Sequence, residues 1–296
     1  MPSLYVKIRH KMSLTAHRKV RTALEGEYTS VSKGRSMDFD DLREYIVGDD
    51  VKDIDWKATA RSGSVRIRRY VAIRKHNIML VVDTGRSMAA TAPSGECKRD
   101  IAVMTAGVIA SVVQKHADLI GMTAGNGEDV HHMPLKGSVA HIERILQYIN
   151  THATLDAPAS DLGNVLDYVR RTIRKRMMLI VISDNLQFAA TEEQLLRRLG
   201  AQHELLFIGI DDLDPSANGW NTKGVFDVDS PAVLPAFVRK QKGVDEAYQQ
   251  LLRTETEQAH RTLEHIRISS IRIEKESEVI NQIVRLLEEH KHAKRR

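Results

Sequence analysis

The stretch that decides the fold runs Asn77-Ile78-Met79-Leu80-Val81-Val82 and continues directly as Asp83-Thr84-Gly85-Arg86-Ser87-Met88. Its first half is apolar from Ile78 onward and rich in branched side chains, which predicts a strand buried on both faces of a sheet. Its second half places a carboxylate, a glycine and a hydroxyl at every second residue. Ligands gather where parallel strands end, and a carboxylate beside a hydroxyl suits Mg²⁺, which prefers oxygen ligands. The loop 83–88 is therefore the first candidate for a binding site.

The chain after this loop alternates strands with helices. The pattern predicts strands at 119–123, 129–134, 177–183, 205–210, 225–228 and 266–273. It predicts helices at 98–114, 139–149, 161–175, 192–199, 235–257 and 278–290. The first two of these strands flank the turn Gly125-Asn126-Gly127, which favours a hairpin. The helix over 98–114 carries small side chains, so a neighbour can pack close to it. Strands separated by helices predict a parallel sheet with helices on both faces.

The composition limits the functional classes. The chain has 296 residues, a net charge of +5 and 5% aromatic residues, so it is only mildly basic and offers few platforms for stacked bases. Cys97 is the single cysteine, which excludes an internal disulfide and fits a reducing compartment. The N-terminus does not read as a secretory signal, and the longest apolar runs are too short for a membrane helix. We therefore expect a soluble, cytoplasmic protein of one α/β domain with an accessory region and no membrane span.

Residues 3–24 are basic and predict an amphipathic helix. The cations of this segment are Lys7, Arg9, Lys11, Arg18, Lys19 and Arg21. A solvated helix face is the interpretation that we favour, and contact with a membrane surface or with nucleic acid is the alternative.

An acidic run precedes the first buried strand. Four aspartates, at positions 49, 50, 53 and 55, fall within seven residues and end at Trp56. The run lacks the alternation and the terminal glutamate of an EF-hand calcium loop. We expect a rigid structural element in which Trp56 packs on the core and Asp49 or Asp55 pairs with Arg43 or Arg61, while part of its surface serves a partner.

Two distant positions are expected to join the loop 83–88. Ser160 lies where a loop enters the helix 161–175, and Asp184 follows the strand 177–183. If the strands ending at Asp83 and Asp184 are neighbours, both loops open on the same edge of the sheet. The alternatives are an ordinary helix cap at Ser160 or Asp161 and an ordinary turn at Asp184. We favour the shared site.

These residues carry a family resemblance. The Asp83-x-Gly85-x-Ser87 loop, Ser160-Asp161 and Ser183-Asp184 resemble a von Willebrand factor A-like domain, in which a D-x-S-x-S loop, a threonine and an aspartate form a metal ion-dependent adhesion site. Upstream, the segment from Phe39 to Arg61 resembles the signature of the domain of unknown function 58 family. The matching signature residues are Phe39, Asp40, Leu42, Arg43, Tyr45, Gly48, Asp49, Asp50, Ile54, Asp55, Trp56, Lys57, Ala58, Ala60 and Arg61.

The resemblance implies an architecture and a set of functional residues. It implies a Rossmann-like three-layer α/β/α sandwich over 77–290, preceded by a segment 1–76 and followed by a basic tail 291–296. Mg²⁺ would be held by Asp83, Ser87, Ser160 and Asp184, and its open coordination position would take a carboxylate from a partner. Gly85 stands where the family has a serine, so one hydroxyl ligand is missing, and water could fill the place. The signature residues expected to be partner-binding or structural are Arg43, Tyr45, Asp49, Asp50, Asp55, Trp56 and Arg61.

The resemblance also implies a function. It implies a non-enzymatic adaptor that works with a MoxR-type AAA+ ATPase, and with a client that the sequence does not name, in maturation or assembly of other proteins. One alternative is nucleic-acid binding through the basic N-terminal helix and the tail Lys294–Arg296. Another is a metal-assisted phosphohydrolase using Asp83 and Asp184, although no evident general base or second metal cluster accompanies them.

Overall fold

The computed structural model describes residues 3–15, 28, 38–46, 49–71, 76–184, 188–213, 228 and 244–293. The chain forms two compact units, Ser32–His76 and a larger unit of Met1–Val31 with Asn77–Arg296. The predicted segment 1–76 is thereby divided, because helix α1 (Leu4–Thr15) packs on helices of the larger unit. Helix α1 therefore belongs to the larger unit, and residues 32–76 form the smaller one.

The larger unit is built on a six-stranded sheet in the order β5-β4-β3-β6-β7-β8. The strands are β3 (Asn77–Asp83), β4 (Leu119–Gly125), β5 (Val130–Lys136), β6 (Met178–Ser183), β7 (Glu204–Ile210) and β8 (Ser269–Ile273). Every neighbouring pair is parallel except β4 and β5, which form the predicted hairpin. The chain adds β4 and β5 on one side of β3 and then crosses to add β6, β7 and β8 on the other. The sheet therefore has its topological switch point between β3 and β6.

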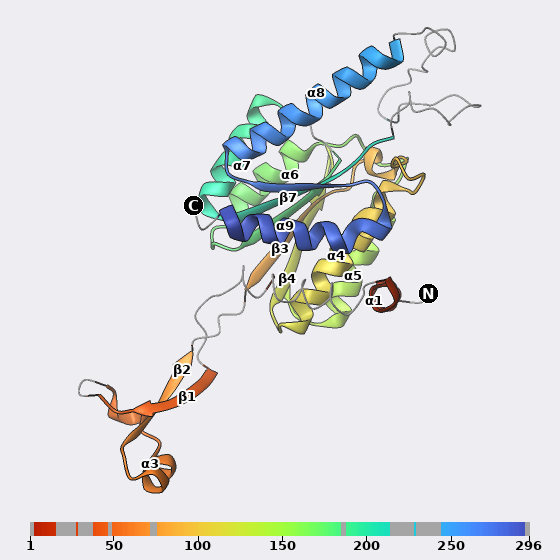
Figure 1. The fold of residues 1–296 in the computed structure, drawn as a ribbon. Coiled ribbons are helices and arrows are strands. Elements are labelled where there is room, and N and C mark those ends of the chain that lie inside the picture. The colour runs from red at the N-terminus through yellow and green to blue at the C-terminus, as the bar shows by residue number, and fades with distance from the viewer. Residues whose placement is uncertain are drawn as a thin grey trace. The chain divides into compact units, whose positions relative to one another are not determined.

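Helices cover both faces of this sheet (Figure 1). One face carries α4 (Lys98–Lys115), α5 (Val139–His152) and α9 (Val279–Ala293), and the other carries α6 (Leu162–Thr172), α7 (Ala190–Gln202) and α8 (Val244–His265). Alternate residues of β3 supply the two cores: Leu80 and Val82 pack with the first set of helices, whereas Met79 and Val81 pack with the second. The predicted three-layer α/β/α sandwich is confirmed.

Some predicted elements fall beyond the described residues. The predicted strand 225–228 lies there except for residue 228, as do the beginning of the helix 235–257, the helical positions 16–24 and residues 294–296. Helix α9 ends at Ala293, so it extends three residues into the predicted basic tail.

In the smaller unit, β1 (Asp38–Glu44) pairs antiparallel with β2 (Arg66–Val71), and the connection holds the short helices η1 (Val51–Asp53) and α3 (Trp56–Ser62). The acidic run shapes this connection. Arg43 donates to Asp49 over 2.6 Å, so the predicted pairing is confirmed. Asp50 caps η1, and Asp55 caps α3 by accepting from the backbone N–H groups of Lys57 and Ala58.

The predicted packing of Trp56 is wrong, because 66% of its surface is exposed. Trp56 is the first residue of α3, and α3 has no buried residue. Among the side chains described in this unit, Ile67 is the buried hydrophobic one. A two-stranded ribbon with one short helix has too little surface to enclose an indole ring.

Helix α1 packs on the rest of the larger unit through its apolar side. Tyr5, Ile8 and Met12 are buried in the core that α4 and α5 share. A Cβ atom at Gly107 would lie 2.4 Å from Ile8 Cδ1, so the glycine allows α1 and α4 to approach closely. This is the close packing that the small side chains of α4 predicted. Lys11 lies outside and pairs with Glu276 over 2.7 Å, in agreement with a solvated basic face.

Glu143 of α5 caps the N-terminus of α1. Its carboxylate accepts hydrogen bonds from Ser3 Oγ, Leu4 N, Tyr5 N and Gln147 Nε2 at 2.6–2.9 Å. Burial raises the pKa of Glu143, but these hydrogen bonds outweigh burial and lower the pKa to about 2. A carboxylate is favourable here because the N-terminal end of a helix carries partial positive charge.

The first prediction concerns this cap. The pKa of Glu143 is lower in the folded state than in the unfolded state, so its stabilising contribution is present above about pH 4.5 and is lost as the pH falls toward 2. We expect Glu143→Gln to lower the free energy of unfolding at pH 7 by about 1 kcal/mol. The difference from wild type should shrink by pH 3 in denaturant titrations. Glu288→Gln, on the exposed side of α9, is the control. A difference that stays constant between pH 7 and pH 3 contradicts the assignment.

Candidate functional site

The four predicted site residues meet at the switch point of the sheet. Asp83 ends β3, Ser87 lies in the short helix η2 (Arg86–Ala89), Asp184 follows β6, and Ser160 precedes α6. Ser87 Oγ donates to Asp184 Oδ1 over 3.0 Å and lies 2.6 Å from Ser160 Oγ. Ser160 in turn hydrogen-bonds Asp83. We call these four residues the switch-point cluster.

Local hydrogen bonds hold the loops in place. Gly85 N donates to Asp83 Oδ1 over 2.8 Å, which closes a tight turn after β3. Arg86 N donates to the carbonyl oxygen of Pro158 over 3.0 Å, so the segment before α6 is fixed to this turn. Asp161 takes the capping position of α6 by accepting from Asn164 N. Ser160 is therefore left to join the cluster.

The structure explains why position 85 is a glycine and not the serine of the family pattern. A Cβ atom there would lie 2.3 Å from Ser160 Oγ, 2.4 Å from Ser160 Cα and 2.5 Å from Ser160 N. Real Cβ contacts are never this short, so any side chain at position 85 would have to displace the backbone of Ser160. The place of the missing serine hydroxyl is thus filled by Ser160 rather than left free for water.

Lys98, the first residue of α4, completes the site and was not predicted as part of it. Its side chain is fully buried, and Nζ lies 2.6 Å from Asp184 Oδ2 and 2.9 Å from Asp212 Oδ1. Asp212 follows β7 and is largely exposed. The sequence carried one signal for Lys98, because a cation in the first turn of an apolar helix opposes the helix dipole and needs a compensating anion.

Burial and charge together set the protonation of the cluster. Burial, followed by the charge of Asp184, raises the pKa of Asp83 to about 7. Burial lowers the pKa of Lys98, but Asp184 and Asp212 outweigh burial and raise it, which keeps the ammonium group charged. Hydrogen bonds join Asp184 to Ser87, Ser87 to Ser160 and Ser160 to Asp83, so the four side chains form one connected network.

The residues present do not fit Mg²⁺ in this arrangement. Adjacent ligands of an octahedral Mg²⁺ ion lie about 2.9 Å apart and direct their lone pairs at the ion. Ser87 Oγ and Ser160 Oγ are 2.6 Å apart and are hydrogen-bonded to one another. Both carboxylate oxygens of Asp184 are engaged as well, one by Ser87 and one by the Lys98 ammonium group.

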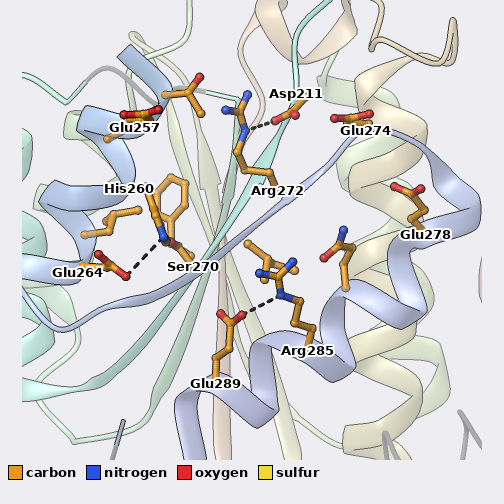
Figure 2. Close-up of a pocket in the computed structure, with 16 residues that line it drawn as sticks. Asp211, Glu257, His260, Glu264, Ser270, Arg272, Glu274, Glu278, Arg285 and Glu289 are labelled. Carbon is orange, nitrogen blue, oxygen red and sulfur yellow. Dashed lines mark hydrogen bonds and ion pairs between the residues drawn. The ribbon is translucent and has the colours of Figure 1, made fainter. Parts of the chain in front are cut away.

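A second polar feature, a groove of about 780 Å³, lies along β8 between α8 and α9. Figure 2 shows carboxylates from both helices and from the strand ends around it. Its acidic residues are Asp211, Glu257, Glu264, Glu274, Glu278 and Glu289. Arg272 pairs with Asp211, and Arg285 pairs with Glu289 over 2.8 Å. Asp211 lines this groove while the next residue, Asp212, contacts Lys98, so the groove begins close to the cluster. No sequence pattern had indicated this groove.

The second prediction tests whether a side chain at position 85 would collide with Ser160. We expect Gly85→Ser to destabilise the protein by about 1–3 kcal/mol, because the new side chain collides with backbone atoms of Ser160. Gly137→Ser is the matched control, since a Cβ atom there meets nothing closer than 3.4 Å. Thermal and denaturant unfolding of both variants measure the effect. A Gly85→Ser protein as stable as wild type would show that this site has room for the family's serine.

Across the described helices, none is both long and apolar enough to span a bilayer. Two crystal structures are similar: an aerotolerance-related membrane protein from Bacteroides fragilis, and the conserved hypothetical protein BatB from Bacteroides thetaiotaomicron. They are 14% and 13% identical, cover 72% and 73% of this chain and 99% of their own chains, and have TM-scores of 0.44.

The chain also has relatives of similar sequence. Uncharacterized proteins of Mycobacterium tuberculosis and Mycobacterium bovis are 32% identical to it over 217 residues, which are 72% of this chain and 66% of theirs. The matched region thus spans just under two thirds of the length of these relatives. The family described as "Protein of unknown function DUF58" matches residues 41–256, so this chain belongs to that family.

Proposed function

We propose that this protein is a non-enzymatic, protein-binding adaptor that works with a MoxR-type AAA+ ATPase in maturation or assembly of other proteins. The observation that carries the proposal is the exposure of large apolar side chains in the family signature. Ile46 is 65% exposed, Val51 60% and Trp56 66%, all within eleven residues. Exposed large apolar side chains, tryptophan above all, are typical of surfaces that bind other proteins.

The polar residues of the signature hold these exposed apolar side chains in a fixed conformation. Arg43 and the backbone N–H of Ile46 both bind the carboxylate of Asp49, which fixes the turn after β1. The capping interactions of Asp50 and Asp55 fix the two short helices that carry Val51 and Trp56. A surface held in one conformation before it binds loses less conformational entropy on binding, which favours affinity. These contacts support a signature whose polar residues are structural and whose exposed apolar residues bind a partner.

The switch-point cluster favours binding over catalysis. The oxygens of Asp83 accept from Gly85 N and Ser183 Oγ, and those of Asp184 accept from Ser87 and Lys98. A phosphohydrolase would need these carboxylates to hold a metal or activate water. Their engagement within the chain supports an adaptor.

The docking of α1 bears on the nucleic-acid alternative. Its apolar side is buried against α4 and α5, and Lys11 is paired with Glu276. Arg18, Lys19, Arg21 and the tail 294–296 lie outside the described residues. The described part of α1 therefore gives no observation that favours nucleic-acid binding.

The third prediction is made for Trp56. We expect Trp56→Ala to weaken binding of the MoxR-type ATPase encoded in the same genome by about tenfold or more, the usual loss for a tryptophan at the centre of an interface. The fold should be unchanged, because the side chain is exposed. Titration of the ATPase into labelled protein, with circular dichroism of both variants, measures the two effects.

Leu155→Ala is the matched control, since Leu155 is 62% exposed but lies in the larger unit. Equal affinity of the Trp56→Ala protein and wild type contradicts the proposed contact surface. The absence of any ATPase binding by the wild-type protein contradicts the partnership itself.

A further inference from the structure

We propose that the ammonium group of Lys98 is the resident cation of the switch-point cluster, and that it compensates the charge of Asp184, the role that the family resemblance assigns to Mg²⁺. The inference concerns the chemistry of the cluster, and it deepens the proposed adaptor function by making the cluster independent of metal. Two structural observations carry it: the contacts of Lys98, and the packing of Ser160 against Gly85.

The contacts of Lys98 are those of a buried counter-ion. The side chain of Lys98 is fully buried and that of Asp184 is 6% exposed, yet their charged atoms lie 2.6 Å apart. Two charges removed from water in this way are tolerated when each compensates the other at hydrogen-bonding distance. Asp212 adds a second, more exposed carboxylate at 2.9 Å from the same ammonium group. The positive charge beside Asp184 is therefore supplied from within the chain.

Backbone contacts fix this cation to the loop that carries Ser87. Lys98 N donates to the carbonyl oxygen of Ala90, and Ala90 N donates to the carbonyl oxygen of Ser87, both at 2.9 Å. The start of α4 and the helix η2 thus form one connected structure. Because the ammonium group and the Ser87 hydroxyl both bind Asp184, this connection sets their spacing.

A divalent ion would compete with this arrangement at two points. It would have to take an oxygen of Asp184 from Lys98 and then lie close to an ammonium group of like charge. It would also have to separate Ser87 Oγ from Ser160 Oγ, while Ser160 is held against Gly85. The ammonium group has neither of these disadvantages, because it binds the oxygen of Asp184 that does not accept from Ser87.

The test uses the purified protein alone, so its result does not depend on whether an ATPase binds. Thermal unfolding and isothermal titration with Mg²⁺ are measured for wild type, for Lys98→Ala and for Lys98→Ala combined with Asp184→Asn. We expect no heat of binding and no shift of the midpoint for wild type in 10 mM Mg²⁺ relative to a chelator. Lys98→Ala should unfold at a lower temperature and should be stabilised by Mg²⁺, because it leaves Asp184 and Asp212 without their cation and opens space for an ion that need not separate the two serines.

The double variant should recover part of the lost stability and lose the response to Mg²⁺. It also keeps the test decisive if Lys98→Ala fails to fold, since removing the uncompensated carboxylate should then restore folding. Lys11→Ala is the matched control, because it breaks a lysine–glutamate pair at the surface and should change little. Stabilisation of wild type by Mg²⁺, a Lys98→Ala protein that ignores Mg²⁺, or a double variant no more stable than Lys98→Ala would each overturn the proposal.

Discussion

A carboxylate that ends a strand buried on both faces must find its hydrogen bonds inside the protein. Asp83 is in this position, because β3 lies in the middle of the sheet and is enclosed by both sets of helices. Its partners come from the turn at Gly85, from Ser183 at the end of β6 and from Ser160 before α6. The cost of leaving a buried polar group unsatisfied links these three segments. The shape of this end of the sheet follows from that requirement.

The same requirement explains why a lysine is present. Asp184 lies beside Asp83 at the switch point, and two buried carboxylates repel one another unless one is neutral or a cation is near. Both effects are present here. Burial and the neighbouring charge raise the pKa of Asp83, and Lys98 supplies an ammonium group to Asp184. A charged side chain can thus meet the electrostatic need that a bound metal ion would otherwise meet.

In the smaller unit, the groups left without a buried environment are apolar side chains. It has too few residues to enclose its own large apolar side chains, so Ile46, Val51 and Trp56 remain at the surface. Its aspartates instead bind backbone N–H groups and Arg43, which gives the connection between β1 and β2 a definite conformation. In the larger unit, hydrogen bonds between polar groups allow apolar side chains to be buried. In the smaller unit, hydrogen bonds of polar groups hold apolar side chains in a fixed position at the surface.

Much of the fold followed from local pattern. The apolar run before Asp83 predicted β3, the turn at 125–127 predicted the hairpin of β4 and β5, and the small side chains of α4 predicted a closely packed neighbour. The meeting of Asp83, Ser87, Ser160 and Asp184 followed from the rule that parallel strands end at a common edge, together with the family resemblance. These inferences succeeded because periodicity, turn chemistry and strand ends are properties of short segments or of the sheet as a whole.

What only the tertiary structure decided were the partners of particular side chains. Lys98 is 86 residues from Asp184 and 114 from Asp212, and nothing in the local sequence of any of the three names the others. The exposure of Trp56 depended on how much surface its unit could bury, and the role of Gly85 depended on a backbone segment more than seventy residues away. By itself, the sequence determined the strands, the helices and the edge at which the polar residues gather. The choice between a metal ion and an ammonium group at that edge was made by three-dimensional packing, because it rests on distances between atoms that only folding brings together.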